Sequence, residues 1–535
     1  MKRNRILAVV LAISMLAVAF VACTAPAAPP QPTTPQAEAT APAQPQATAP
    51  ATVETPDPAT ISRGLVIATQ NEPPSVAPAR HVALAGGFMN ALTHNGLFKM
   101  NYSDLEPIPD LITDWSAISD TVFEFTLREG VMFHNGEELT AYDVVASMFY
   151  LRTYPEARAQ HGSIVYSYVI DRYTFRLDTG SPNAALFVDL TNQANFILPQ
   201  SLIDAGHDFT VDPVGSGPFI FEEWRTGDSL HFVRFDNYFD TARAPQLEYI
   251  SWRIIPEGSS RTIALEAGEV DYIVEVAFPD IPRMQANPDL YVQIVPGTAF
   301  NFLLLNNDLP YFENVYVRRA IDMAIDKEAA VIASVDGFGI PLWSNTPPVF
   351  AGSSDVGIRS FDPDAARALL AEHNINPENI SFAMLASNEE GRRRGEVVQA
   401  NLADIGIQTT IEMVDLATYL SVTQVGDYEA GFGGFIASNL IQFLRGTSHI
   451  DSINAQNRSR MYSRELSDLV NEAVATIDTD TRLALLEQAS IVANEHVGFI
   501  PMHLGMVIRA FDANLVVPEL SATGSMHLNM AFWAE

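Results

Sequence analysis

The chain has a single cysteine, Cys23, so no disulfide can form within it. Without disulfides, a fold is stabilised mainly by a buried core, which requires length and enough apolar residues. The 535 residues are 47% hydrophobic. About 475 of them follow a proline-rich stretch that ends at residue 58, too many for one core. We therefore expect two or three domains.

The residues before Cys23 have the layout of an export signal. Three basic residues lie within the first five, and an unbroken apolar run extends from Ile6 to Ala22. This layout is typical of secretory signals, and the run falls short of the ~20 residues that span a bilayer. It resembles a bacterial lipoprotein signal, although Phe20 stands where leucine is usual. We predict a signal peptide over 1–22 and a lipid on Cys23; the alternative is an uncleaved membrane anchor with an incidental cysteine.

Residues 23–58 are predicted to be a disordered linker. They consist almost wholly of Ala, Pro, Thr and Gln, with no aromatic residue. Such a segment buries too little apolar surface to fold, and its prolines favour extended conformations. Fully stretched, it would reach on the order of 100 Å. We expect it to tether a folded body to a lipid.

The net charge of −33 limits the partners of the body. A strongly acidic protein is repelled by phosphate backbones, and no basic stripe with interleaved aromatic residues is present. We therefore expect no nucleic-acid partner. An anionic membrane surface would also repel the body, which suits a body held away on a tether.

Strand and helix patterns alternate along the body. Phe123, Phe125 and Leu127 alternate with polar residues, as in a half-buried strand. Thr140 is a predicted helix N-cap, and Asp143 is placed to reach back to the exposed amides. Capped helices are likewise predicted after Asp362, which precedes Pro363, and over 465–478, where apolar residues recur at helical spacing. The pattern predicts an α/β protein with mixed sheets.

No catalytic or metal-binding motif is evident. HExxH, CxxC and the phosphate loop G-x-x-x-x-G-K-[ST] are absent from the sequence. "GFGGF" at 431–435 lacks the spacing of a dinucleotide site and is interpreted as a turn. Glu495, His496 and His503 are the nearest approach to a metal cluster, and structural histidines are the simpler interpretation. Sixty-four acidic residues leave a catalytic carboxylate pair open, but none stands out. We expect no enzyme activity, no metal and no cofactor.

The stretch "VGSGPFIFEEWRTGDSLHFVRFDNYFD" at 214–240 resembles a signature of ABC-importer solute-binding proteins of family 5. That family includes dipeptide-, oligopeptide- and nickel-binding proteins and typically shows G-[TS]-G-P-[YF] here, then tryptophan, glycine and R-N-x-x-Y-W. Further stretches resemble the family in the same order: 127–147, 264–273, 303–331, 361–372, 404–413 and 499–511. Together they extend over nearly all of 60–515.

The resemblance implies a two-lobed, periplasmic-binding-protein-like α/β fold of the large (cluster C) type, with an extra domain inserted in the first lobe. The first lobe would comprise 59–100, 210–297 and 505–535, the inserted domain 101–209, and the second lobe 298–504. Crossings are expected near 295–300 and 500–505, with ligand held between lobes that close by hinge motion. We expect "GSGPF" to be scaffold rather than a ligand contact.

The function that the resemblance implies is capture of a peptide-like or other small solute and its delivery to ABC permease subunits. We expect a monomer, lipid-anchored at the extracytoplasmic face of the membrane, in the periplasm or on the cell surface. Two alternatives remain open: an exported hydrolase, and a receptor that binds ligand and signals to a membrane partner.

The ligand-facing turn departs from the peptide-binding pattern. Such members have a tryptophan followed by an aspartate that pairs with the peptide ammonium; here Phe435 stands near the tryptophan and Ser438 or Asn439 near the aspartate. A buried ammonium without a carboxylate is costly. We therefore expect an aromatic, neutral turn, with Trp343 as a second stacking face, suited to a sugar or a blocked, amide-rich ligand. The alternatives are that Ser438 and Asn439 are ordinary loop residues, or that Asp427 or Asp451 takes the ammonium.

Overall fold

The computed structural model describes residues 63–78, 84–101, 106–154, 164–183, 185–476, 478–518, 520–526 and 528–534. Cys23, the predicted signal peptide and the predicted linker lie outside these residues, so the anchor stays a prediction. Residues 57–535 form one compact unit.

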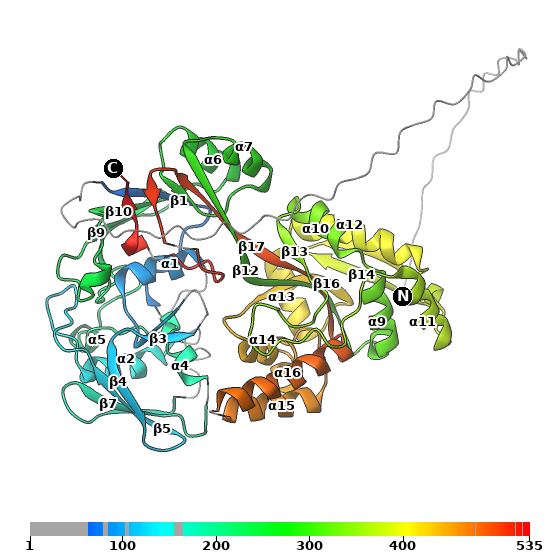
Figure 1. The fold of residues 1–535 in the computed structure, drawn as a ribbon, viewed down its shortest axis with the longest axis horizontal. Coiled ribbons are helices and arrows are strands. Elements are labelled where there is room, and N and C mark those ends of the chain that lie inside the picture. The colour runs from blue at the N-terminus through cyan, green and yellow to red at the C-terminus, as the bar shows by residue number, and fades with distance from the viewer. Residues whose placement is uncertain are drawn as a thin grey trace, which may run out of the picture. The chain divides into compact units, whose positions relative to one another are not determined.

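An 11-stranded mixed sheet runs through this unit (Figure 1). Its order is β15 (Gln408–Met413), β14 (Ser381–Ala386), β16 (Ala430–Ile436), β12 (Leu290–Leu305), β17 (Phe499–Asp512), β11 (Tyr272–Ile273), β1 (Leu65–Thr69), β10 (Tyr249–Ile254), β9 (Ser229–Arg234) and β8 (Phe219–Arg225). β13 (Gly339–Pro341) pairs with β17 off this path. The sheet is mixed, as the sequence predicted.

The long strands β12, in green, and β17, in red, lie side by side and join the two ends of the sheet (Figure 1). Their register shifts between Pro296 and Phe300. β16 pairs with β12 from residue 299 onward, whereas β11 pairs with β17 at Ala510 and Phe511. The register shift falls within the stretch predicted for the first crossing. The domain limits themselves stay a prediction.

A separate antiparallel sheet lies within the range predicted for the inserted domain. It has the order β4 (Ile112–Ala117), β5 (Val122–Leu127), β7 (Thr174–Asp178) and β6 (Tyr166–Val169). The apolar residues of β5 are buried, as their alternation predicted. α2 (Ala141–Leu151) begins after Thr140, whose backbone N–H donates to the Asp143 carboxylate at 2.8 Å. The predicted cap residue and its acidic partner are thus confirmed.

The longest of the remaining helices, α12 and α16, lie in the second half of the chain. The first half has α1 (Leu84–Thr93), α4 (Leu186–Asp189), α5 (Gln200–Asp204), α6 (Gly258–Glu266) and α7 (Ile281–Gln285). The second half has α8 (Pro310–Glu313), α9 (Val315–Ala324), α10 (Lys327–Val335), α11 (Pro363–Glu372), α12 (Glu389–Asp404), α13 (Leu416–Val425), α14 (Leu440–Thr447), α15 (Arg464–Ala475) and α16 (Thr479–His496). The predicted helices after Asp362 and near 465–478 are thus present as α11 and α15.

Two small two-stranded sheets complete the fold: β2 (Phe98–Met100) with β3 (Pro107–Pro109), and β18 (Leu515–Val516) with β19 (Phe532–Trp533).

The "GSGPF" stretch packs directly on the C-terminal end of α1. Gly217 donates its backbone N–H to the Thr93 carbonyl at 3.0 Å. A Cβ atom on Gly217 would lie 2.4 Å from the Thr93 carbonyl carbon, and one on Gly215 would lie 2.2 Å from the Thr93 oxygen. Both contacts are with backbone atoms, so only glycine fits. The motif has the geometry of a scaffold.

Candidate ligand-binding site

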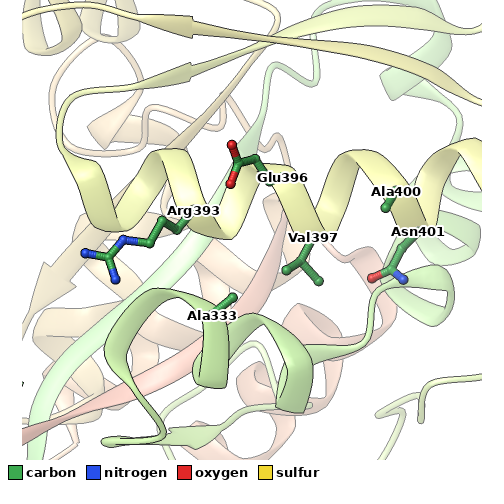
Figure 2. Close-up of a pocket in the computed structure, with 6 residues that line it drawn as sticks. All are labelled: Ala333, Arg393, Glu396, Val397, Ala400 and Asn401. Carbon is green, nitrogen blue, oxygen red and sulfur yellow. The ribbon is translucent and has the colours of Figure 1, made fainter. Parts of the chain in front are cut away.

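One hollow of about 380 Å³ lies between α10 and α12 (Figure 2). Ala333 lines it from α10, and Arg393, Glu396, Val397, Ala400 and Asn401 line it from α12. The polar side chains here are already paired: Arg393 lies 3.6 Å from the Glu389 carboxylate, and the Asn401 amide oxygen accepts from the Asp326 backbone N–H. With no aromatic face and no unpaired buried group, this hollow is a weak candidate for a ligand site.

A second cavity, of about 350 Å³, has the chemistry of a binding site. It is formed by β12, β16, α13, the first turns of α12 and the loop around Arg458. Phe302, Phe432 and Phe435 contribute aromatic walls. Leu416 and Leu420 also line it, although their side chains are exposed. Ligand sites are typically concave, mostly apolar and furnished with a few polar groups, and this cavity meets that description.

Arg394 is the main polar group of this cavity. Its side chain is 3% exposed, and it makes no hydrogen bond or ion pair with any described residue. Its guanidinium carbon lies 5.9 Å from the centre of the Phe432 ring. Burial lowers the pKa of Arg394 to about 10, and the negative charge of Glu390, one helical turn away, acts in the opposite direction. Buried charges are normally paired, so an unpaired guanidinium points to a missing partner.

Tyr419 supplies a second unpaired polar group. Its ring is buried, and its hydroxyl has no hydrogen-bond partner among the described residues. Burial raises the pKa of this phenol, while the charges of Arg458 and Arg394 act in the opposite direction. A Cβ on Gly433 would lie 2.7 Å from the Tyr419 hydroxyl oxygen. The interpretation of "GFGGF" as a turn is therefore wrong: the glycines lie in strand β16, where Gly433 leaves room for Tyr419.

Of the residues predicted to bind ligand, the structure places only Phe435 in this cavity. Its ring lies 6.0 Å from that of Phe443, edge to face. The Asn439 amide oxygen accepts from the Gln442 backbone N–H at 2.8 Å, and Asn439 is the N-cap of α14. The Ser438 backbone N–H donates to the Gln442 side chain. Both residues thus have local structural roles, and their ligand contacts stay a prediction.

Trp343 is not among the residues that line this cavity. Lys327 is fully buried, and its ammonium lies 4.5 Å from the centre of the Trp343 ring and 2.7 Å from the Asp322 carboxylate. The ring therefore covers a buried ion pair. The proposed stacking role of Trp343 is not tested by this arrangement.

The cavity is also lined by charged residues that the sequence pattern does not predict as ligand contacts. Arg394 and Arg458 are its two cations, and Glu390 is the one acidic residue lining it among those described. Asp427 and Asp451, considered for an ammonium, are exposed and do not line it. His503 is buried, and its pKa is lowered to about 3 by burial and by the nearby charge of Arg394. The described residues include no group of three or more His, Cys, Asp or Glu able to hold a metal.

Replacing Asn439 tests its role as a helix cap. Asn439→Ala is expected to lower the free energy of unfolding by about 1 kcal/mol, because the backbone N–H of Gln442 loses its acceptor. Asn439→Asp keeps an acceptor and should retain most of the stability. Urea unfolding of the two variants measures the difference. Equal losses in both would show that the side-chain acceptor at 439 is not what stabilises the start of the helix.

Comparison with known proteins identifies the family. The sequence profile of the bacterial extracellular solute-binding proteins, family 5 (middle part), matches residues 106–442. The chain belongs to this family, and the resemblance inferred from its motifs is confirmed. Family members are solute-binding proteins of ABC transporters that act outside the cytoplasm, not enzymes. Within the described residues, no helix has the length and apolar character needed to cross a membrane.

Individual relatives agree with this assignment. Heme-binding protein A of Haemophilus influenzae is 28% identical over 480 residues, covering 82% of this chain and 86% of the relative. The dipeptide-binding protein of Escherichia coli is 27% identical over 439 residues, covering 75% and 82%. The solved structure of HbpA2 from Haemophilus parasuis is similar with a TM-score of 0.80 at 23% identity, covering 88% of this chain and 100% of that one. This structural likeness confirms the two-lobed fold class.

Proposed function

We propose that this chain is a lipid-anchored protein that captures a small solute between two lobes and delivers it to the permease subunits of an ABC transporter. The observation that carries the proposal is the cavity of about 350 Å³ in which Arg394 and Tyr419 present buried polar groups that have no partner in the part of the chain that the structure describes. Leaving such groups unsatisfied costs free energy, and a ligand would recover it. Family membership supports the transport role. The lobe limits given above are part of the proposal.

The relatives suggest the range of ligands without fixing one. By name, one relative binds heme and another binds dipeptides. We propose a peptide-like or other small solute, with Phe435 as an aromatic contact. Trp343, Ser438 and Asn439 belong to the proposal as contacts made once the lobes have closed on the ligand. The protein is proposed to act as a monomer at the extracytoplasmic face of the membrane.

Thermal-shift screening against peptides, oligosaccharides and metal chelates tests the binding function. A compound that raises the melting temperature should then be taken up by cells that carry the gene and not by cells that lack it. Binding without any loss of uptake in the deletion strain would favour a receptor. Conversion of the bound compound into products would favour a hydrolase.

Cys23→Ser tests the anchor. Lipid attachment requires the thiol, so the variant should leave the membrane fraction or persist as an uncleaved precursor. Fractionation and mass spectrometry of the N-terminus measure both outcomes. Wild-type processing together with full membrane retention in the variant would contradict the lipid anchor.

A further inference from the structure

The second cavity has an unbalanced charge. Arg394 and Arg458 contribute two cations, neither of which forms an ion pair with a described residue, against the single carboxylate of Glu390. Glu390 makes no ion pair with Arg394, although the two are four residues apart on α12. Burying a guanidinium without a partner costs several kcal/mol, so the residues that line the cavity do not by themselves balance its charge.

Arg394, Arg458 and Tyr419 all line the same cavity. The Tyr419 hydroxyl is buried and has no hydrogen-bond partner among the described residues, and the charges of both arginines act on it. A guanidinium presents several N–H donors in a plane and binds a carboxylate through two of them, and a phenol adds a further donor. Two N–H groups of a guanidinium and the O–H of Tyr419 are three donors that have no acceptor among the described residues. They fit an anion with two oxygens better than a neutral hydroxyl group.

The walls indicate the rest of the ligand. Phe302, Phe432 and Phe435 line the cavity together with Leu416 and Leu420, whose side chains are 58% and 38% exposed. Exposed leucines beside aromatic rings offer apolar area that a ligand would cover. The expected ligand is thus amphipathic, with an acidic end and an apolar body.

We propose, on the basis of the proposed solute-binding function, that the ligand is an organic acid whose carboxylate binds Arg394 and Tyr419 and whose apolar body packs on the phenylalanines. The carboxylate belongs either to a free acid or to the C-terminus of a peptide. This differs from the neutral, sugar-like ligand that the 435–439 turn alone suggests. A free ammonium would find one carboxylate, Glu390, within the lining.

Matched acid and amide pairs test the inference on the whole protein. We expect 3-phenylpropionate to raise the melting temperature, and 3-phenylpropionamide to leave it unchanged. Ala-Phe and acetyl-Ala-Phe should bind if the carboxylate comes from a peptide, and Ala-Phe amide should not. Loss of binding on acetylation alone would show that the ammonium is the recognised group, which overturns the proposal.

Variants locate the binding. Arg394→Met should weaken binding of the acids at least about 30-fold, the loss expected when one partner of a buried charged pair is truncated. Its ligand-free melting temperature should stay equal or rise, because an unpaired buried charge has been removed. Arg393→Met, on another face of the same helix and paired with Glu389, is the control and should bind normally. Tyr419→Phe keeps the ring and should weaken acid binding about tenfold.

Results that contradict the carboxylate proposal can be distinguished from results that contradict the solute-binding function. Equal binding of acids and amides, or a lower ligand-free melting temperature of Arg394→Met, overturns the carboxylate proposal. A neutral sugar that binds equally well to wild type and Arg394→Met also overturns it, while the proposed solute-binding function stands. If no compound of any class binds, both proposals fail.

Discussion

Gly217→Ala is expected to lower the free energy of unfolding by about 3 kcal/mol or more, beyond the usual range for overpacking. The new Cβ would lie 2.5 Å from the Leu92 oxygen and 2.6 Å from the His94 nitrogen. These are backbone atoms at the end of α1, and they cannot rotate away as a side chain would. Relief requires β8 and α1 to separate, which also breaks the hydrogen bond from Gly217 to Thr93.

Gly505→Ala is the matched control for this prediction. Its added Cβ would meet its nearest neighbour, the Ala299 Cβ, at 3.4 Å, an ordinary van der Waals distance. Chemical unfolding followed by circular dichroism measures both variants. A loss in Gly217→Ala no greater than in Gly505→Ala would show that α1 shifts easily and that "GSGPF" is not a rigid scaffold.

Local patterns predicted several elements because the causes of those elements are local. Phe123, Phe125 and Leu127 are buried and the residues between them are half-buried, as their alternation predicts. Asp362 accepts from the Ala365 N–H at 2.8 Å, as a helix cap should. The two-lobed fold, by contrast, came from the family resemblance. Pairing of β12 with β17 joins residues about two hundred positions apart, and no local pattern specifies such a contact.

Arg394 is a part of the site that the sequence pattern does not predict. It stands in "GRRRGE", where three adjacent arginines suggest a solvated helix face. Only the rotation of α12 decides which of them is buried. The same helix has a buried stripe of small and apolar residues: Gly391, Gly395, Val398 and Leu402. This stripe is the sequence signal that marks the buried face of α12.

Asn439 fits two different sequence patterns. The family pattern predicts a ligand contact, whereas Asn followed three residues later by Gln is a helix-start signal. In the structure, Asn439 accepts from Gln442 and begins α14. Local capping explains the residue type without any ligand.

Lys327→Met is expected to lower the free energy of unfolding by about 3–5 kcal/mol, since it leaves a buried carboxylate without its cation. Asp322 and Lys327 are both fully buried, and the second oxygen of Asp322 has no hydrogen-bond partner among the described residues. Arg359, at 3.8 Å from that oxygen, is too far away for a direct hydrogen bond. The methionine is close to lysine in length but has no ammonium, so it loses both the ion pair with Asp322 and the charge over the Trp343 ring, and most of the loss is electrostatic.

A double-mutant cycle separates this charge effect from simple loss of packing. Asp322→Asn together with Lys327→Met removes both charges, so the double variant should be more stable than the sum of the two single losses predicts. Arg367→Met is the control, because its ion pairs with Asp364 and Asp404 are exposed and should each contribute at most about 1 kcal/mol. Strictly additive losses at 322 and 327 would mean that the two charges do not stabilise each other.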